Sequence, residues 1–84
     1  MNKLEILKKK IKYRASYRGT KEMDILLTTF IASAIENLEY GDLLKLDVFL
    51  SCNDEEIYNF YMSGSDIPSF SDKKILSLFK SFKI

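Results

Sequence analysis

A basic residue and a glycine precede two carboxylates at the start of a predicted helix, in the stretch Arg18-Gly19-Thr20-Lys21-Glu22-Met23-Asp24. Glycine adopts backbone angles that other residues resist, so Gly19 can separate two helices and let another surface approach the main chain. Glu22 and Asp24 would lie at the positive end of the helix dipole, which favours carboxylates. From these residues alone, the stretch is either an ordinary corner between helices or a surface arranged for a partner.

Catalytic chemistry is largely excluded by residues that the chain lacks. It has no histidine, which removes the commonest general base, the common zinc ligand and every nucleophile that histidine activates. Glu22 and Asp24 are two positions apart on a helix and diverge, a poor geometry for an acid and base pair. The glycines stand too far apart for a phosphate-binding loop. We expect no catalytic residue, no metal site and no tightly bound nucleotide cofactor.

The net charge of +1 conceals an asymmetry along the chain. Residues 1–21 hold eight Lys or Arg against one acid, whereas residues 22–84 hold five against eleven. Such a basic arm could bind nucleic acid, an anionic membrane or an acidic protein. A solvated helix face explains Lys8-Lys9-Lys10 more simply, and no nucleic-acid-binding signature accompanies it. We therefore expect no nucleic-acid partner.

Cys52 is the only cysteine, so the chain forms no internal disulfide and fits a reducing compartment. It lies at a predicted helix junction, where a small apolar side chain packs well, and we interpret it as a packing residue. No apolar run approaches the roughly 18 residues of a membrane span, and the N-terminus lacks a secretory signal. We expect a cytoplasmic protein without membrane insertion.

Apolar residues recur at helical spacing along most of the chain. The clearest stripe predicts a central helix through Met23, Leu26, Leu27, Phe30, Ile31, Ala34, Ile35 and Leu38. Before it, a basic first helix is predicted over about 3–17, with Gly19 near the expected place of a C-terminal glycine. After it, Gly41-Asp42 should reset the chain before a third helix that carries Leu43, Leu46, Val48, Phe49 and Leu50.

Two further helices are predicted toward the C-terminus. Asn53 and Glu56 have the spacing of a capping box that opens a fourth helix. A turn-rich linker over 63–68 follows, after which Ser69 or Ser71 could cap a last helix with Ile75, Leu78, Phe79 and Phe82. No convincing strand remains. We predict an all-α fold, a compact five-helix bundle in which residues 1–84 form a single domain with its core over 20–83.

The motif Arg18-Gly19-x-x-Glu22-x-Asp24 resembles the RGxxExD signature of the succinate dehydrogenase flavinylation factors, known as SdhE in bacteria and as succinate dehydrogenase assembly factor 2 in mitochondria. About thirty residues on, 51–62 resembles the family's acidic CDDP-type turn and the aromatic, Asn, aromatic, x, Met pattern that follows it. The similarity extends from about Lys10 to Phe82. Thr20 and Phe60 depart from the hydrophobic residue and the Trp often found there.

This resemblance implies an assembly factor that binds the flavoprotein subunit of succinate dehydrogenase, with fumarate reductase as a further candidate client. The factor would promote covalent attachment of FAD to a histidine of that subunit, acting on FAD that the partner holds. Carried over by position, the partner-binding residues are Arg18, Gly19, Glu22 and Asp24. Arg18 would supply a fixed cation, Gly19 would allow close approach, and Glu22 would orient Arg18 or pair across the interface.

Another class of function uses the same exposed motif. A small helical protein-interaction module, antitoxin-like and without a role in flavinylation, would also present Arg18, Gly19 and Glu22 to a partner. Identifying the partner separates the two hypotheses. An independent enzyme fits the residue content least.

Overall fold

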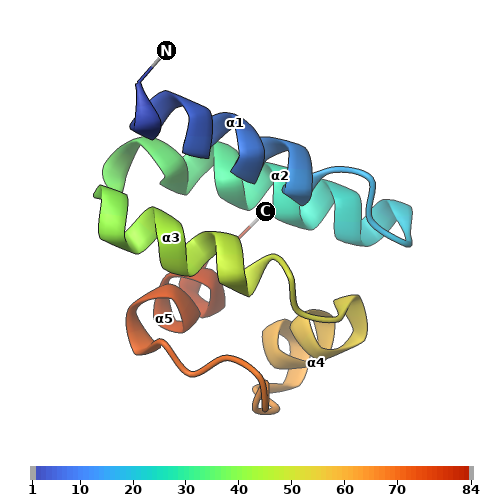
Figure 1. Cartoon of the computed structure of the whole chain (residues 1–84). Coiled ribbons are helices and arrows are strands. Elements are labelled where there is room, and N and C mark those ends of the chain that lie inside the picture. Colours follow the sequence, from blue (N-terminus) through green and yellow to red (C-terminus); the bar gives the residue numbers. More distant parts are fainter. Residues whose placement is uncertain (1, 84) are drawn as a thin grey trace.

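Two antiparallel helices lie side by side along one face of the molecule, and three shorter helices pack beneath them (Figure 1). The computed structural model describes residues 2–83. In chain order the elements are α1 (Lys3–Ala15), α2 (Lys21–Ala34), the short 3₁₀ helix η1 (Ile35–Asn37), α3 (Tyr40–Phe49), α4 (Asp54–Ser63) and α5 (Lys73–Ser81). The radius of gyration is 12.0 Å, and a compact chain of this length is expected to have about 12 Å. The predicted all-α fold with five helices is confirmed.

An aromatic cluster centred on α5 holds the helices together. Phe79 is fully buried, and its ring centroid lies 5.0 Å from Phe30 of α2, 5.2 Å from Phe49 of α3 and 5.0 Å from Tyr61 of α4. Edge-on and tilted ring pairs at this spacing are favourable beyond the area that they bury. The last helix is therefore the element that joins α2, α3 and α4 into one core.

Side chains cap the N-termini of most helices, because the first backbone N–H groups of a helix have no partner within it. Asn53 accepts from the Glu55 N–H at 2.8 Å and opens α4, as predicted, although the bond does not go to Glu56. At α5 the predicted caps, Ser69 and Ser71, are wrong. Asp72 caps the helix by accepting from the Ile75 N–H at 3.0 Å, which lowers the pKa of its carboxyl, and Lys45 lowers it further.

The first helix ends earlier than predicted. It stops at Ala15, and the residue with left-handed backbone is Tyr17, at φ 58°, in place of the predicted Gly19. Glycine usually occupies such a position, since a side chain there costs about 1–2 kcal/mol. The left-handed turn reverses the chain directly before Arg18.

Three other sequence expectations differ in detail. The central helix ends at Ala34 and tightens into η1, while Leu38 is already extended. Gly41 lies inside the first turn of α3, so the chain resets at Leu38 and Glu39. Val48 and Leu78, assigned to apolar stripes, are 53% and 37% exposed. Helical spacing alone did not identify which side of these short helices meets the core.

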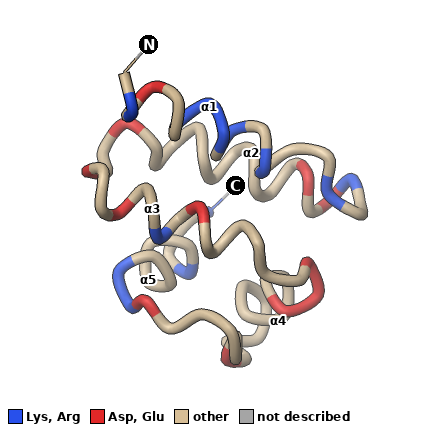
Figure 2. The backbone as a smooth tube through the Cα atoms, viewed as in Figure 1, with Lys and Arg blue, Asp and Glu red and all other residues tan. Residues whose placement is uncertain are grey.

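Figure 2 shows the basic residues gathered along α1, and acids of the same chain pair with half of the eight basic residues of the arm. Lys8 of α1 pairs with Glu36 at 2.6 Å, and Lys10 and Arg14 both reach Asp47 of α3, at 3.1 and 3.2 Å. Half-exposed pairs of this kind are each worth at most about 1 kcal/mol. They nevertheless give part of the charge asymmetry an intramolecular reason, because basic residues of α1 lie against single acids of η1 and α3.

Candidate partner-binding site

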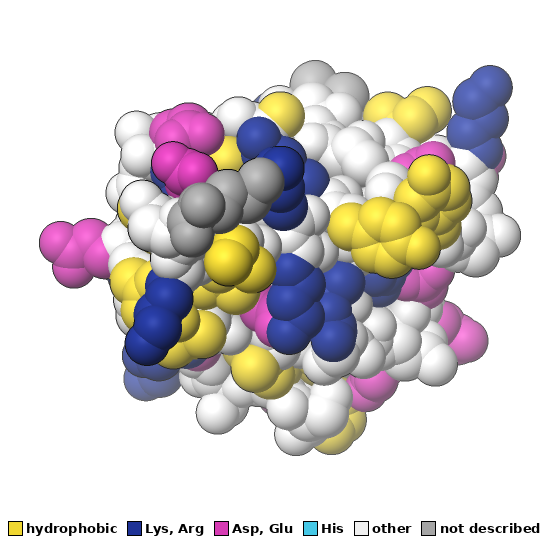
Figure 3. Space-filling model, turned by 45° about the horizontal axis from the view of Figure 1, so that its top comes forward, with side chains coloured by type: hydrophobic (Ala, Val, Ile, Leu, Met, Phe, Trp, Pro, Cys, Tyr) yellow, Lys and Arg dark blue, Asp and Glu magenta, His cyan; other side chains and the backbone are white. Residues whose placement is uncertain are grey.

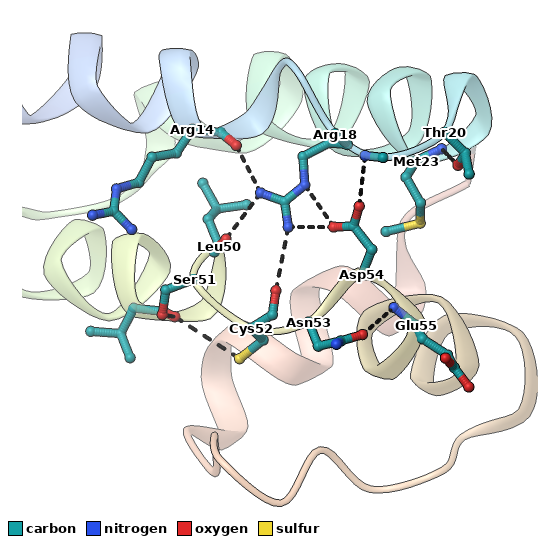
Figure 4. Close-up of polar contacts among 12 residues, drawn as sticks. Arg14, Arg18, Thr20, Met23, Leu50, Ser51, Cys52, Asn53, Asp54 and Glu55 are labelled. Carbon is teal, nitrogen blue, oxygen red and sulfur yellow. Dashed lines mark hydrogen bonds and ion pairs between the residues drawn. The ribbon is translucent and has the colours of Figure 1, made fainter.

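Arg18 is bound on every side by its own chain (Figure 4). Its Nε donates to Asp54 Oδ1 at 2.8 Å, and its Nη2 lies 2.6 Å from the same oxygen. The remaining donors reach three backbone carbonyls, those of Arg14 at 2.8 Å, Leu50 at 3.0 Å and Cys52 at 3.4 Å. Of the five N–H donors of a guanidinium, four form hydrogen bonds here, and the ion pair with Asp54 adds a further contact.

Gly19 completes this arrangement through its main chain. Its N–H donates to the other Asp54 oxygen, Oδ2, at 2.9 Å. A Cβ at Gly19 would lie 3.4 Å from that oxygen, at the near limit of ordinary contact. A methyl group would therefore still fit beside the carboxylate of α4, whereas a longer side chain would have to extend past it. The close approach expected at this position is made by Asp54 of the same molecule.

The Arg18–Asp54 junction, defined as these two residues and Gly19, joins three parts of the fold. It ties the end of α1 to the α3–α4 loop and to the first residue of α4. The Arg18 side chain is only 11% exposed. The expectations that Arg18 faces solvent and that Glu22 orients it are wrong, because Asp54 holds the guanidinium and the loop carbonyls cover it. The alternative, that Glu22 pairs across the interface, stays a prediction.

Beside the junction lies a groove with a volume of about 660 Å³. The start of α2 forms one wall and the start of α4 the other, and we call it the α2–α4 groove. Its lining residues are Gly19, Thr20, Glu22, Met23, Asn53, Asp54, Glu55 and Tyr58. Apolar atoms make up most of its surface. The groove is therefore a hollow with an apolar floor, which the two predicted motifs build together.

The four predicted site residues separate into distinct environments. Gly19 and Glu22 line the groove, and Glu22 is exposed. Arg18 lies behind it in the junction. Asp24, two residues after Glu22 on α2, is half-buried and does not line the groove, and its backbone carbonyl accepts from the Thr28 hydroxyl at 2.7 Å. The structure thus brings two of the four to one surface.

Sequence reasoning assigned no role to three residues of the second wall. Asp54 belongs to the acidic turn noted in the sequence, and its partner Arg18 is 36 positions away. Glu55 and Tyr58 follow on the first turns of α4, where Tyr58 is 42% exposed. The spacing of Asp54, Glu55 and Tyr58 places them near one end of a helix, but only the fold sets that end against α2.

Other candidate chemistry receives no support from the described part of the chain. Cys52 is buried in the core cluster, with its sulfur 3.7 Å from the Ser69 hydroxyl, which confirms the packing interpretation. Among residues 2–83, no group of three His, Cys, Asp or Glu side chains is placed to hold a metal ion. None of the helices in that range has both the length and the apolar character that a membrane crossing requires.

Residues 9–83 match the model of a family described as the flavinator of succinate dehydrogenase. The chain is 28% identical over 78 residues to succinate dehydrogenase assembly factor 2, mitochondrial, of Dictyostelium discoideum, covering 93% of this chain and 55% of that protein. It is 30% identical over 79 residues to assembly factor 2-B, mitochondrial, of Drosophila ananassae, covering 92% and 48%. The chain thus spans about half the length of these relatives.

A third relative, assembly factor 2 of Penicillium rubens, is 38% identical over 56 residues, which cover 67% of this chain and 17% of that protein. No solved structure matches the chain. The family model covers nearly all of the helices described above, including both walls of the α2–α4 groove. The chain belongs to the flavinator of succinate dehydrogenase family, a family of succinate dehydrogenase assembly factors.

Proposed function

We propose that this chain binds the flavoprotein subunit of succinate dehydrogenase and promotes covalent attachment of FAD to a histidine of that subunit. The observation that carries the proposal is the α2–α4 groove, which the two motifs of the resemblance build from opposite sides. Gly19 and Glu22 of the first motif face the hollow together with Asn53 and Glu55 of the second. An exposed hollow with an apolar floor is a surface suited to a protein partner.

The chain's own part in the reaction is positional. With no histidine in this sequence, it supplies no imidazole for a flavin bond, so we assign the nucleophile to the client. We propose that the client also holds the FAD. Binding would hold the client's flavin region in the arrangement that reacts, a contribution from orientation and not from covalent chemistry. Arg18 acts in this scheme as a positioning residue, because its four hydrogen bonds and its ion pair all go to its own chain beside the groove.

Co-expression with the flavoprotein subunit of the same organism tests the proposal. We expect flavin fluorescence in the denatured subunit band when the wild-type chain is present and a much weaker band without it. Glu22→Ala should weaken the band, while Glu5→Ala, which removes an exposed carboxylate from the first turn of α1, should not. Equal fluorescence with and without the chain would contradict the proposal.

Two further parts of the proposal need their own measurements. We propose fumarate reductase as a second client, which the same gel tests with its flavoprotein subunit. We also propose a cytoplasmic location, which cell fractionation tests. Flavinylation of that second subunit and the location of the protein in the cell are properties of the whole protein, so neither measurement tests the groove by itself.

A further inference from the structure

We propose that the α2–α4 groove receives one arginine or lysine side chain of the client, with its aliphatic stem on the apolar floor and its charged head between Glu22 and Glu55. This inference rests on the proposed function, and it names the chemistry by which the partner is recognised. It adds Glu55 and Tyr58, on α4, to the residues that contact the client.

The net charge of the groove depends on which of its carboxylates already bind a cation or an N–H group of the same chain. Asp54 lines the hollow, but both of its oxygens are engaged, one by Arg18 and one by the Gly19 N–H. Glu22 and Glu55 are exposed, and among residues 2–83 neither side chain forms an ion pair or accepts a hydrogen bond. Two negative charges therefore remain, one on each wall.

The floor gives the occupant its shape. Met23, which is 4% exposed, and Tyr58, which is 42% exposed, line the hollow together with the two glutamates, so a thioether and an aromatic ring share it with the two carboxylates. Long basic side chains bury their methylene stems on such surfaces while the charged head stays near water or an acid. A cation over the face of a tyrosine gains a further attraction. An acidic side chain would be repelled by the two carboxylates, and a purely apolar one would leave them without a partner.

No positively charged side chain of the described residues lines the groove. Lys21 begins α2 beside Glu22 but does not line the groove, and the guanidinium of Arg18 is enclosed behind Asp54. Neither of these two cations therefore lines the groove. Charge complementarity favours a basic side chain over a phosphate or an acidic peptide, even though two helix N-termini, which favour anions, meet here.

Binding measurements with the purified flavoprotein subunit test the inference. Glu22→Gln and Glu55→Gln keep the size of each side chain and remove its charge, and each should weaken the complex by at least about tenfold. Glu5→Gln is the matched control, because Glu5 is also an exposed carboxylate in the first turn of a helix, at the far end of α1. It should change the affinity less than about twofold.

The client residue is then identified by charge reversal. Exposed Arg and Lys residues of the flavoprotein subunit are changed to Glu one at a time and paired with Glu55→Lys of this chain. We expect one client variant that weakens the wild-type complex and restores binding to Glu55→Lys. If no client cation couples to Glu22 or Glu55, or if both Gln variants bind as wild type, the inference is overturned. Failure of the wild-type chain to bind the subunit at all would instead overturn the proposed function.

Discussion

The two halves of the Arg18-Gly19-x-x-Glu22 motif have opposite surroundings. Arg18 and Gly19 are bonded to Asp54 and to the carbonyls of the α3–α4 loop, whereas Glu22 is exposed at the α2–α4 groove. Four positions in the sequence separate the enclosed guanidinium of Arg18 from the open surface at Glu22, and Gly19, which bonds to Asp54 but also lines the groove, lies between them. The first half gives the groove its shape, and the second half remains available to a partner. Variants should therefore affect stability and partner binding in different proportions.

Arg18→Ala should have the largest effect on stability. It leaves the Asp54 carboxylate and three carbonyls without their donor, and breaking a pair with one buried member is costly. Since Asp54 is 31% exposed and can regain water, we expect about 2–4 kcal/mol, below the full cost of a buried pair. Urea unfolding measures this loss.

A double-mutant cycle checks that the loss comes from the junction. Asp54→Ala should cost a similar amount, and Arg18→Ala with Asp54→Ala should cost clearly less than the sum of the two, because the pair acts as one unit. Arg18→Lys keeps the charge but not the planar fork, so it should recover only a minor part. Additive losses would mean that the two residues do not share one interaction.

Gly19→Arg comes next and affects both properties. A side chain at this position begins 3.4 Å from Asp54 Oδ2 and extends at the edge of the groove. We expect a loss of about 1–2 kcal/mol, within the usual range of single substitutions, together with loss of client binding. Gly19→Ala is the control. It adds only the Cβ, and we expect the protein to unfold within about 1 kcal/mol of wild type and still to bind.

The fold was more predictable from the sequence than the site. The residues of the aromatic cluster around Phe79 follow from apolar spacing, which indicates which residues avoid water. The central stripe through Phe30 is buried as expected except at Ala34 and Leu38, which are partly buried. The roles of Arg18 and Asp54 depend on a contact across 36 positions. Periodicity contains no information on such a pairing, and an arginine beside a glycine looks the same whether it faces solvent or a neighbouring helix.

The same limit explains the errors at the helix ends. Ser69 and Ser71 were plausible caps by residue type, but Asp72 is the residue whose carboxylate reaches the Ile75 N–H. Gly19 was a plausible helix terminator, yet Tyr17 takes the left-handed conformation. Several neighbouring residues could perform each local task, and packing of the whole chain selects among them.

Glu22→Ala should separate the two halves of the motif most sharply. Its side chain forms no bond within residues 2–83, so unfolding should shift by less than about 1 kcal/mol, mainly from the lost helix-dipole interaction. Flavinylation of the co-expressed subunit should nevertheless fall. The comparison of the two halves is wrong if Glu22→Ala destabilises the protein as much as Arg18→Ala does.

Lys9→Ala should have the smallest effect of all, and it tests whether the basic arm is a second working surface. Lys8 and Lys10 on either side are paired with Glu36 and Asp47, while Lys9 is exposed and forms no ion pair within the part of the chain that the structure describes. A solvated lysine at the rim contributes little to affinity and mainly affects the rate of association at low salt. We expect unchanged unfolding and unchanged flavinylation at moderate salt, with at most a slower association when the salt concentration is reduced. If Lys9→Ala abolishes flavinylation while Glu22→Ala does not, the client binds the first helix and the groove is not the site of recognition.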